Sequence, residues 1–400
     1  MIPFSPPRVD EETIKAVTEV LRSGWITTGP KTKLFEKEIV QYCNCSNVLC
    51  LNSATAGLEL ALRWYGVGEG DEVILPAYTY AATANVVMHC GAIPVLADVN
   101  KDDFNISLTS IEKKITSKTK VIMPVDFGGL PCDYGAIMAL VTLQKSKFIP
   151  KGINQEKLGR IMVLSDAAHS FGATYKGKRT GSLADISVFS FHAVKNLTTA
   201  EGGAMTFNLH APFNNSEIYN ELCIKSLHGQ NKDALAKSQK GSWRYDIVEA
   251  GYKCNMTDIV AAIGLVELKR YNDTLAKRKY IVNYYQKAFS LHEWAELPVF
   301  KDEQRESSYH LFPLRIKGVD EKKRDNIIQK IFDKDVSVNV HFIPLPMLSF
   351  YKGLHYKISD TPVTYENYSR EISLPVYYDL TDEQLKQVVN AVAKSVEETL

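Results

Sequence analysis

The sequence has no long apolar run. No window approaches the roughly 20 apolar residues that a membrane-spanning helix needs. The first residues, MIPFSPPRVDEETIKAV, lack a basic segment followed by an apolar stretch. We therefore expect no membrane span and no secretory signal peptide, and hence a cytoplasmic protein.

The sequence also lacks an excess of charge of one sign and lacks closely paired cysteines. The 47 lysines and arginines nearly balance the 46 aspartates and glutamates, and the formal net charge is +1. With no basic block or acidic tail, the pattern predicts no nucleic-acid partner. The seven cysteines contain no CxxC pair, and Cys43 and Cys45 are too close for a zinc site. We expect reduced thiols and no metal.

Short apolar runs of strand length recur through the first two thirds of the chain, separated by helical or loop-like segments. These runs occupy residues 73–75, 94–97, 121–125, 161–164, 186–189 and 204–207. Most lack polar alternation, which is typical of a mostly parallel sheet that is buried on both faces. The pattern therefore predicts an α/β fold with helices flanking the sheet.

The last third of the chain has a different pattern. Helical and strand-like segments follow one another at residues 276–289, 310–316, 322–332 and 336–342. A final helix should begin after Thr381, a good N-cap residue. We predict a large domain over residues 1–255 and a smaller C-terminal α+β domain over residues 256–400. The lysine-rich segment 144–157 is interpreted as a surface insertion.

An aspartate follows the apolar run in LSDAAHSFGA, residues 164–173. Ligands of open α/β sheets bind beyond the carboxyl ends of the strands, which is where Asp166 should lie. A carboxylate there could hold the protonated nitrogen of a pyridine ring and keep that ring electron-poor. Strand-end aspartates are also common turn caps, and this simpler explanation would suffice for Asp166 alone.

A lysine follows the next predicted strand, in SVFSFHAVKNLTTAEGGAMTF. Partial burial lowers the pKa of a lysine and makes its amine nucleophilic. Such an amine can also move a proton between two carbons. Most lysines are solvated surface charges, but Lys195 and Asp166 should lie on neighbouring strands, which favours a functional role for both.

Small residues precede a predicted helix in LNSATAGLELAL, residues 51–62. The backbone N–H groups of Ala54 and Thr55 could bind a phosphate at the helix N-terminus, although ordinary capping is the alternative. Tyr80, in PAYTYAATAN, could stack on a flat ring or simply pack. An anion cradle, an aromatic platform, a carboxylate and a lysine together match pyridoxal 5'-phosphate (PLP), so the sequence predicts this cofactor.

These motifs resemble those of the sugar aminotransferases of the DegT/DnrJ/EryC1/StrS family. The resemblance covers nearly the whole chain and includes SGWITTGP, GDEVILPAYTYAATAN, DAAHSFGA, FSFHAVKNLTTAEGG, GYKCNMTDIVAAIGLVELKR, VNVHFIPL and ISLPVY. It implies the aspartate-aminotransferase fold of PLP enzymes, fold type I, with a mostly parallel seven-stranded sheet and a smaller C-terminal domain.

The resemblance also implies roles for single residues. Lys195 would form the Schiff base with PLP and carry the proton. Asp166 would pair with the pyridine nitrogen, and His169 would hydrogen-bond the phenolic oxygen of the ring. The remaining cofactor contacts would hold the phosphate or the ring face: Ala54, Thr55, Ser190 and Tyr80.

Other residues of the matching motifs point to a second subunit and to the substrate. Asn255 would reach the phosphate of the neighbouring subunit's cofactor, which implies a homodimer with shared sites. Thr28, His310 and His341 match segments that line the sugar-nucleotide pocket. For the two histidines, packing or surface roles are equally open at this point.

Because the chain keeps Lys195, the resemblance favours transamination over the dehydratase activity of family members that carry histidine there. KNLTTAEGG is similar to members that aminate C4 of nucleotide-linked 4-keto sugars. We expect transfer from L-glutamate to a UDP- or dTDP-linked keto sugar, for a surface polysaccharide or glycan. The alternatives are another PLP enzyme of the family, such as a dehydratase or a cyclitol or aminobenzoate type, and a catalytically silent regulator.

Overall fold

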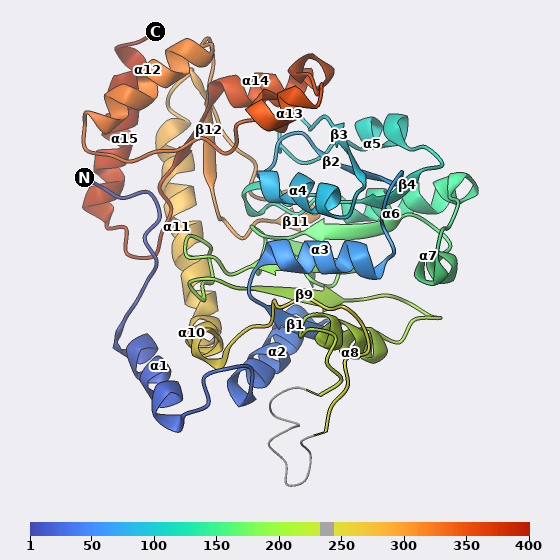
Figure 1. Ribbon diagram of the computed structural model, residues 1–400. Helices are drawn as coiled ribbons and strands as arrows, with labels where there is room; N and C mark the ends of the chain where they lie inside the picture. The colour runs from blue at the N-terminus through green and yellow to red at the C-terminus, as the bar shows by residue number, and fades with distance from the viewer. Residues whose placement is uncertain (233–243) are drawn as a thin grey trace.

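The computed structural model describes residues 1–232 and 244–400. Its centre is a seven-stranded sheet with the strand order β1-β9-β8-β5-β4-β2-β3 (Figure 1). The strands are β1 (Asn47–Leu51), β2 (Glu72–Pro76), β3 (Ile93–Ala97), β4 (Thr119–Ile122), β5 (Met162–Asp166), β8 (Ile186–Ser190) and β9 (Gly203–Phe207). Only β9 runs antiparallel to its neighbours, so the prediction of a mostly parallel sheet is confirmed.

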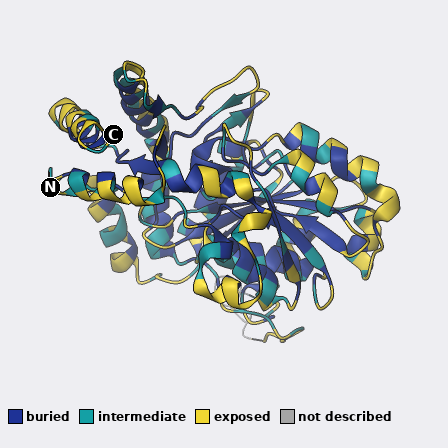
Figure 2. Ribbon diagram, turned by 90° about the horizontal axis from the view of Figure 1, so that it is seen from above, coloured by how far each residue is buried: buried dark blue, intermediate teal, exposed yellow. Residues whose placement is uncertain are grey.

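Helices flank this sheet, and their exposed residues face outward while the strands are buried between them (Figure 2). They are α2 (Pro30–Cys43), α3 (Ala54–Trp64), α4 (Ala81–His89), α5 (Leu108–Lys114), α6 (Tyr134–Leu143), α7 (Ile153–Leu158), α8 (Asn215–Lys225) and α10 (Asp258–Lys269). Burial on both faces explains why the strand sequences lack polar alternation.

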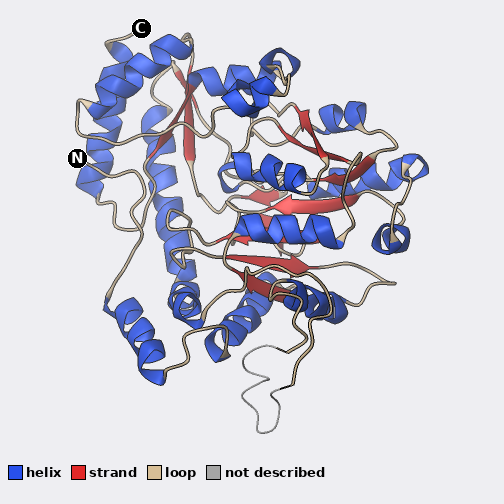
Figure 3. Ribbon diagram, viewed as in Figure 1, coloured by secondary structure: helices blue, strands red, loops and turns tan. Residues whose placement is uncertain are grey.

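The C-terminal part has its own sheet and its own apolar core (Figure 3). The antiparallel sheet β10-β12-β13 consists of β10 (Ala295–Glu296), β12 (Phe312–Ile316) and β13 (Glu371–Leu374). The helices of this part are α11 (Tyr271–Phe289), α12 (Glu321–Phe332), α13 (Ser349–Gly353), α14 (Pro362–Arg370) and α15 (Asp382–Glu397). Thr381 caps α15 as predicted, because its hydroxyl accepts the Gln384 N–H at 3.2 Å.

The remaining elements are one further helix and several short strands and turns. They are α1 (Glu11–Ser23), β6 (Thr174–Tyr175), β7 (Lys178–Arg179), β11 (Arg305–Glu306) and the 3-10 turns η1 (Phe127–Gly129), η2 (Gln144–Lys147), η3 (Leu345–Met347) and η4 (Ile358–Asp360). Within the described residues, no helix combines the length and the apolar character needed to cross a membrane.

One expectation about local structure is wrong. Residues 336–342 form no strand and make only single bridges, from Val336 to Ile2 and from Asn339 to Ser373. Their valines alternate because Val336 and Val338 enter the C-terminal core. Segment 144–157 lies mostly at the surface, as expected. It is anchored by Gln155, whose fully buried side-chain amide donates to the Tyr65 carbonyl at 3.2 Å.

The division of the chain near residue 255 stays a prediction. Helix α10 packs against α1 and α2, beside the large sheet. The C-terminal core gains its first residues from α11, at Ile281 and Val282. Ile2, at the other end of the chain, packs into this same core, so the N-terminal segment spans both parts of the molecule.

Candidate active site

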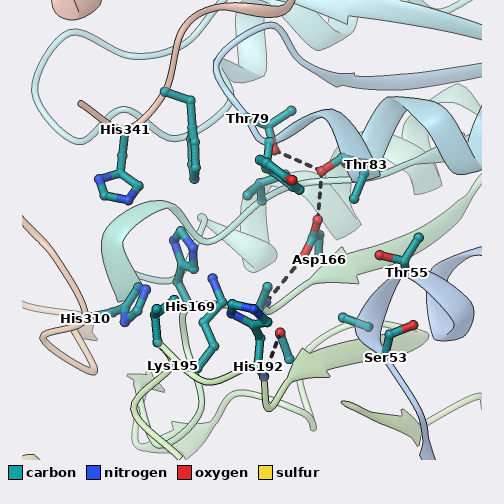
Figure 4. A pocket seen from close by; sticks show the side chains of 18 of the residues that line it. Ser53, Thr55, Thr79, Thr83, Asp166, His169, His192, Lys195, His310 and His341 are labelled. Atoms are coloured by element: carbon teal, nitrogen blue, oxygen red, sulfur yellow. Dashed lines mark hydrogen bonds between the residues drawn. The ribbon is translucent and has the colours of Figure 1, made fainter. Parts of the chain in front are cut away.

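A cavity of about 370 Å³ lies where strands of the large sheet end and residues of the C-terminal part approach them. Most of the residues predicted for the site line it: Ala54, Thr55, Tyr80, Asp166, His169, Ser190, Lys195, His310 and His341. Figure 4 shows the histidines, Lys195 and Asp166 converging on it. Segments far apart in the sequence therefore meet at one place, at the edge of the sheet where ligands were expected.

Asp166 ends β5 and is buried. Its Oδ2 accepts a hydrogen bond from Thr83 Oγ1 at 2.8 Å, and Thr83 is in turn 2.9 Å from Thr79 Oγ1 (Figure 4). The predicted turn cap also exists, since the Ala168 N–H donates to Oδ1 at 3.3 Å. Burial raises the pKa of Asp166, while these hydrogen bonds and the charge of Lys195 oppose the rise. The carboxyl group is thus held in one orientation on the cavity wall.

Lys195 lies in the loop after β8, and its backbone N–H donates to the His192 carbonyl at 2.9 Å. Its amine points into the cavity between His169 and the Asp166 side (Figure 4). Burial lowers the pKa of Lys195 to about 8, and the charge of Asp166 limits the drop. A large share of this amine is therefore neutral and nucleophilic near pH 8.

The start of α3 offers unused backbone donors to the cavity. Ser53 caps the helix by accepting the Ala56 N–H at 3.1 Å, which leaves the N–H groups of Ala54 and Thr55 free for an anion. Gly203 makes this approach possible, because a Cβ there would lie 2.5 Å from the Ala54 nitrogen. Gly203 pairs with Ser190 across β8 and β9, which brings the serine to the same edge.

His169 and His310 lie side by side, with ring centroids 4.3 Å apart. Asn196 donates from Nδ2 to the Ser308 carbonyl at 2.7 Å, so its oxygen faces His310 Nδ1 at 2.9 Å. Since that oxygen can only accept, Nδ1 of His310 carries the hydrogen. Burial lowers the pKa values of both histidines well below the usual value, so both rings are neutral.

His341 approaches from the C-terminal part. Its Nδ1 is 2.9 Å from Ser373 Oγ, and its backbone N–H donates to Glu371 Oε2 at 3.1 Å. Burial lowers the pKa of His341 to about 3. Next to it, the ring of Phe342 lies 5.9 Å from that of His169 and 6.0 Å from that of Tyr80. These rings form a neutral, largely apolar wall opposite the strand ends.

Thr28 and Asn255 lie together but do not line this cavity. Asn255 Nδ2 donates to Thr28 Oγ1 at 2.6 Å, and Thr28 Oγ1 donates to the Met256 carbonyl at 2.5 Å. The geometry thus links two residues that the sequence predicted for different contacts. Their roles toward a cofactor or a substrate stay predictions.

Sequence reasoning missed several residues that hold the site together. Thr83 stands four residues after Thr79 at the start of α4, and this helical spacing could have identified the pair. Asn196 directly follows Lys195 and orients His310. Glu371 begins the strand sequence EISL, and the available signal was only a glutamate directly before apolar strand residues.

The polar groups of the cavity fit PLP. The free N–H groups at the start of α3 suit a phosphate, the Asp166 carboxyl group suits a pyridine nitrogen, and the Lys195 amine suits an aldehyde. His169 Nδ1 is buried and has no hydrogen-bond partner among the described residues. A buried polar atom without a partner is costly, and a bound ligand would supply one.

Comparison with known proteins agrees with this site. The model of the DegT/DnrJ/EryC1/StrS aminotransferase family matches residues 7–393. The uncharacterized protein MJ1066 of Methanocaldococcus jannaschii is 40% identical over 404 residues, which cover 99% of this chain and 98% of that protein. The spore coat polysaccharide biosynthesis protein SpsC of Bacillus subtilis is 38% identical over 398 residues, covering 98% and 96%.

Solved structures are similar over the full length. The sugar aminotransferase Spr1654 from Streptococcus pneumoniae, in its PMP form, has a TM-score of 0.97 and 46% identity over all of both chains. Its PLP form has a TM-score of 0.95 and 44% identity, covering 100% of this chain and 99% of that one. Helicobacter pylori PseC, an aminotransferase involved in the biosynthesis of pseudoaminic acid, has a TM-score of 0.85 and 28% identity, covering 99% of both.

Proposed function

Because the chain belongs to the DegT/DnrJ/EryC1/StrS aminotransferase family, we propose that it transfers an amino group from L-glutamate to C4 of a UDP- or dTDP-linked 4-keto sugar. It is a sugar aminotransferase of fold type I and uses PLP. One observation carries the proposal: the Lys195 amine and the Asp166 carboxyl group share a cavity whose opposite wall holds neutral histidines.

Bound PLP supplies an electrophilic aldehyde and a ring that accepts the charge of a carbanion. In our proposal Asp166 holds the pyridine nitrogen protonated, and Thr83 orients the carboxyl group for that contact. Lys195 would hold the aldehyde carbon and would later carry the transferred proton on its Nζ, which a pKa of about 8 suits. His169, whose buried Nδ1 has no partner among the described residues, would hydrogen-bond the ring oxygen.

The remaining contacts hold the phosphate and the ring face. The N–H groups of Ala54 and Thr55 and the Ser190 hydroxyl bind the phosphate at the start of α3. Tyr80, at the N-terminus of α4, is 66% exposed in the single chain and is free to stack on the ring. These contacts would hold the ring next to Lys195.

The opposite wall suits a sugar. Neutral histidines such as His310 and His341 can form hydrogen bonds with sugar hydroxyl groups without placing a charge in the cavity, and Phe342 offers an apolar face. SpsC is a spore coat polysaccharide biosynthesis protein and PseC takes part in the biosynthesis of pseudoaminic acid, and both support a product for a surface polysaccharide or glycan.

We propose a homodimer whose subunits share their sites. Asn255 and Thr28 form a hydrogen-bonded pair outside the cavity of their own chain, so a second copy could receive them at its cofactor phosphate. Mixing subunits that carry Lys195→Ala with subunits that carry Asn255→Ala tests this. Mixed dimers should contain one site with both residues intact and recover activity, whereas no recovery together with a monomeric mass would contradict the shared site.

Absorption spectroscopy tests the donor half of the reaction. Protein loaded with PLP should show a visible band that L-glutamate converts to the PMP spectrum. The loaded protein is then mixed with glutamate and a panel of UDP- and dTDP-linked 4-keto sugars, with mass spectrometry of the products. An aminated sugar supports the proposal. If glutamate leaves the band unchanged, the proposed donor is wrong. If the spectrum responds to glutamate but no sugar is aminated, the proposed acceptor is wrong.

A further inference from the structure

We propose that His341, Ser373 and Glu371 form a proton relay, in which buried Glu371 stores the proton that His341 Nε2 exchanges with an oxygen of the sugar. The identity of that oxygen rests on the proposed function, but the relay itself is a property of the three side chains. It makes Ser373 and Glu371 positioning residues, because neither lines the cavity.

The three groups form one unbroken chain of hydrogen bonds. Ser373 Oγ lies 2.5 Å from Glu371 Oε1 and 2.9 Å from His341 Nδ1. The other carboxyl oxygen, Oε2, accepts the backbone N–H of His341 at 3.1 Å. The serine hydroxyl has only one hydrogen, so it can donate to the carboxylate or to the imidazole but not to both. The two bonds must therefore run in the same direction.

This constraint defines two states. With Glu371 ionised, Ser373 donates to the carboxylate and accepts the Nδ1–H of His341, so Nε2 presents a lone pair. With Glu371 protonated, the carboxyl group donates to Ser373, which donates to Nδ1, so Nε2 carries a hydrogen. When a proton binds to Nε2, one hydrogen therefore shifts along each bond and Glu371 becomes protonated. His341 and Ser373 stay neutral in both states.

The ring of His341 lines the cavity. Its Nδ1 is turned to Ser373, and no hydrogen bond of Nε2 is found among the described residues, so Nε2 is the ring nitrogen available to a ligand in the cavity. Its ring is held by Phe4, stacked at a centroid distance of 5.5 Å, and by the Ser373 bond. Burial lowers the pKa of His341 to about 3, so the ring does not keep both protons and passes the second one on.

The charges around Glu371 leave it free to store a proton. Arg315 lies 2.8 Å from Glu296 and Arg324 lies 2.7 Å from Asp325, so each arginine already has a carboxylate partner. Tyr78 is a further titratable neighbour, and burial raises its pKa well above the usual value. Burial raises the pKa of Glu371 to about 8 although both arginines oppose the rise.

On the cavity side, the groups that face His341 are the Lys195 amine and the imidazoles of His169 and His310. Burial keeps both imidazoles neutral near pH 7. The positive form of Lys195 opposes a positive charge on His341, which again favours a tautomer change over an imidazolium. Electrostatics on both sides of the ring therefore agree with a relay that moves hydrogen without building charge at the cavity.

In the sugar half of the reaction the ketone oxygen leaves as water. The incoming amine nitrogen first forms a bond to the sugar carbon, while the π bond of the ketone breaks and its electron pair moves to the oxygen. Nε2–H gives this oxygen one proton, which empties Glu371, and the amine nitrogen returns one proton to Nε2, which refills Glu371. The same exchange occurs a second time as the remaining C–O bond breaks, so the oxygen leaves with two protons as water, the nitrogen has lost two, and the relay is unchanged after each turnover.

Nitrogen NMR of [15N]histidine-labelled protein, without added PLP or sugar, tests the relay directly. The two-bond couplings report which ring nitrogen carries hydrogen, and His341→Gln assigns the signal. The expected result is an Nε2–H tautomer about two pH units below 8 and an Nδ1–H tautomer well above it, from the Glu371 pKa of about 8. In Glu371→Gln the amide donates permanently to Ser373, so Nε2–H should persist at every pH.

The matched control is Glu267→Gln, which removes a buried carboxylate that pairs with Arg270 on α10, and it should titrate like the wild type. One tautomer at all pH values in the wild type, or the same pH response in Glu371→Gln, overturns the relay. If Glu371→Gln does not fold, Ser373→Ala replaces it and should abolish the pH dependence of the tautomer.

A kinetic arm separates this proposal from the proposed function. Ser373→Ala should lower kcat for the sugar half-reaction about 10²-fold with little change in KM, and leave the glutamate half-reaction near the wild-type rate. Equal losses in both half-reactions would contradict the relay. If the tautomer switches but no 4-keto sugar is aminated, the proposed function fails and the relay stands.

Discussion

The two walls of the cavity differ in where they keep charge. The wall at the strand ends of the large sheet carries its charges at the surface of the cavity, on Asp166 and Lys195. The wall from the C-terminal part presents neutral His310 and His341 and keeps Glu371 one layer behind. A surface charge suits a cofactor that is itself ionic, whereas a neutral wall suits a sugar whose hydroxyl groups must be released again. The comparison thus assigns cofactor chemistry to one wall and substrate exchange to the other.

Removal of the Lys195 amine should have the largest effect. Lys195→Ala should lower the glutamate half-reaction by at least about 10⁴-fold, because nucleophile and proton carrier are lost together. Lys195→Arg is the control, since it keeps a positive charge that stays protonated. Stopped-flow absorbance with glutamate measures both. A loss below about 10-fold in Lys195→Ala would mean that another base carries the proton.

Asp166→Asn should rank second, with a loss of about 10² to 10³-fold, because it removes the charge that stabilises the ring nitrogen. Asp166 also raises the pKa of Lys195, so in this variant the pKa should fall further below about 8. The rate at which the apoprotein takes up PLP covalently, followed against pH, should shift its midpoint downward. An unchanged midpoint would mean that the charge of Asp166 does not affect the pKa of Lys195.

The two walls differ in how well the sequence predicted them, because their residues come together in different ways. Asp166, Lys195 and the start of α3 follow strands at positions that a parallel sheet brings to one edge, so local pattern was enough. Glu371 reaches His341 only because β13 lies beside the irregular segment 336–342, which was predicted to be a strand. Contacts between segments that are distant in sequence and have no regular period leave little trace in the pattern.

Glu371→Gln should change the pH dependence of stability, which tests the buried layer of the second wall. The pKa of Glu371 is raised from 4.5 to about 8 in the folded chain, so the folded state binds more protons between these values. Its contribution to stability is therefore complete below 4.5 and falls by about 1.4 kcal/mol per pH unit as the pH rises toward 8.

Urea unfolding of Glu371→Gln and wild type at pH 6 and pH 8 measures this contribution. The free energy of unfolding of the variant should gain on the wild type by about 2 kcal/mol or more over that interval. Glu366→Gln, which removes a half-exposed carboxylate paired with Arg370, is the control and should shift by a similar amount at both pH values. If the difference in the free energy of unfolding between Glu371→Gln and the wild type is the same at both pH values, the Glu371 carboxyl group of the wild type is already ionised at pH 6.

Thr83→Val should give the smallest change, on the first wall. The variant keeps the shape of the side chain but removes the 2.8 Å hydrogen bond to Asp166, and a bond to a charged group is worth about 1.5 kcal/mol, or about 10-fold in rate. Thr83→Ser keeps the hydroxyl and should stay near the wild-type rate. If both variants lose the same activity, packing at the start of α4 matters more than the hydroxyl. If only Thr83→Val loses activity, and loses it equally in both half-reactions, Thr83 acts through the cofactor, which both half-reactions use. The Ser373→Ala variant differs, because its loss of activity should appear in the sugar half-reaction alone.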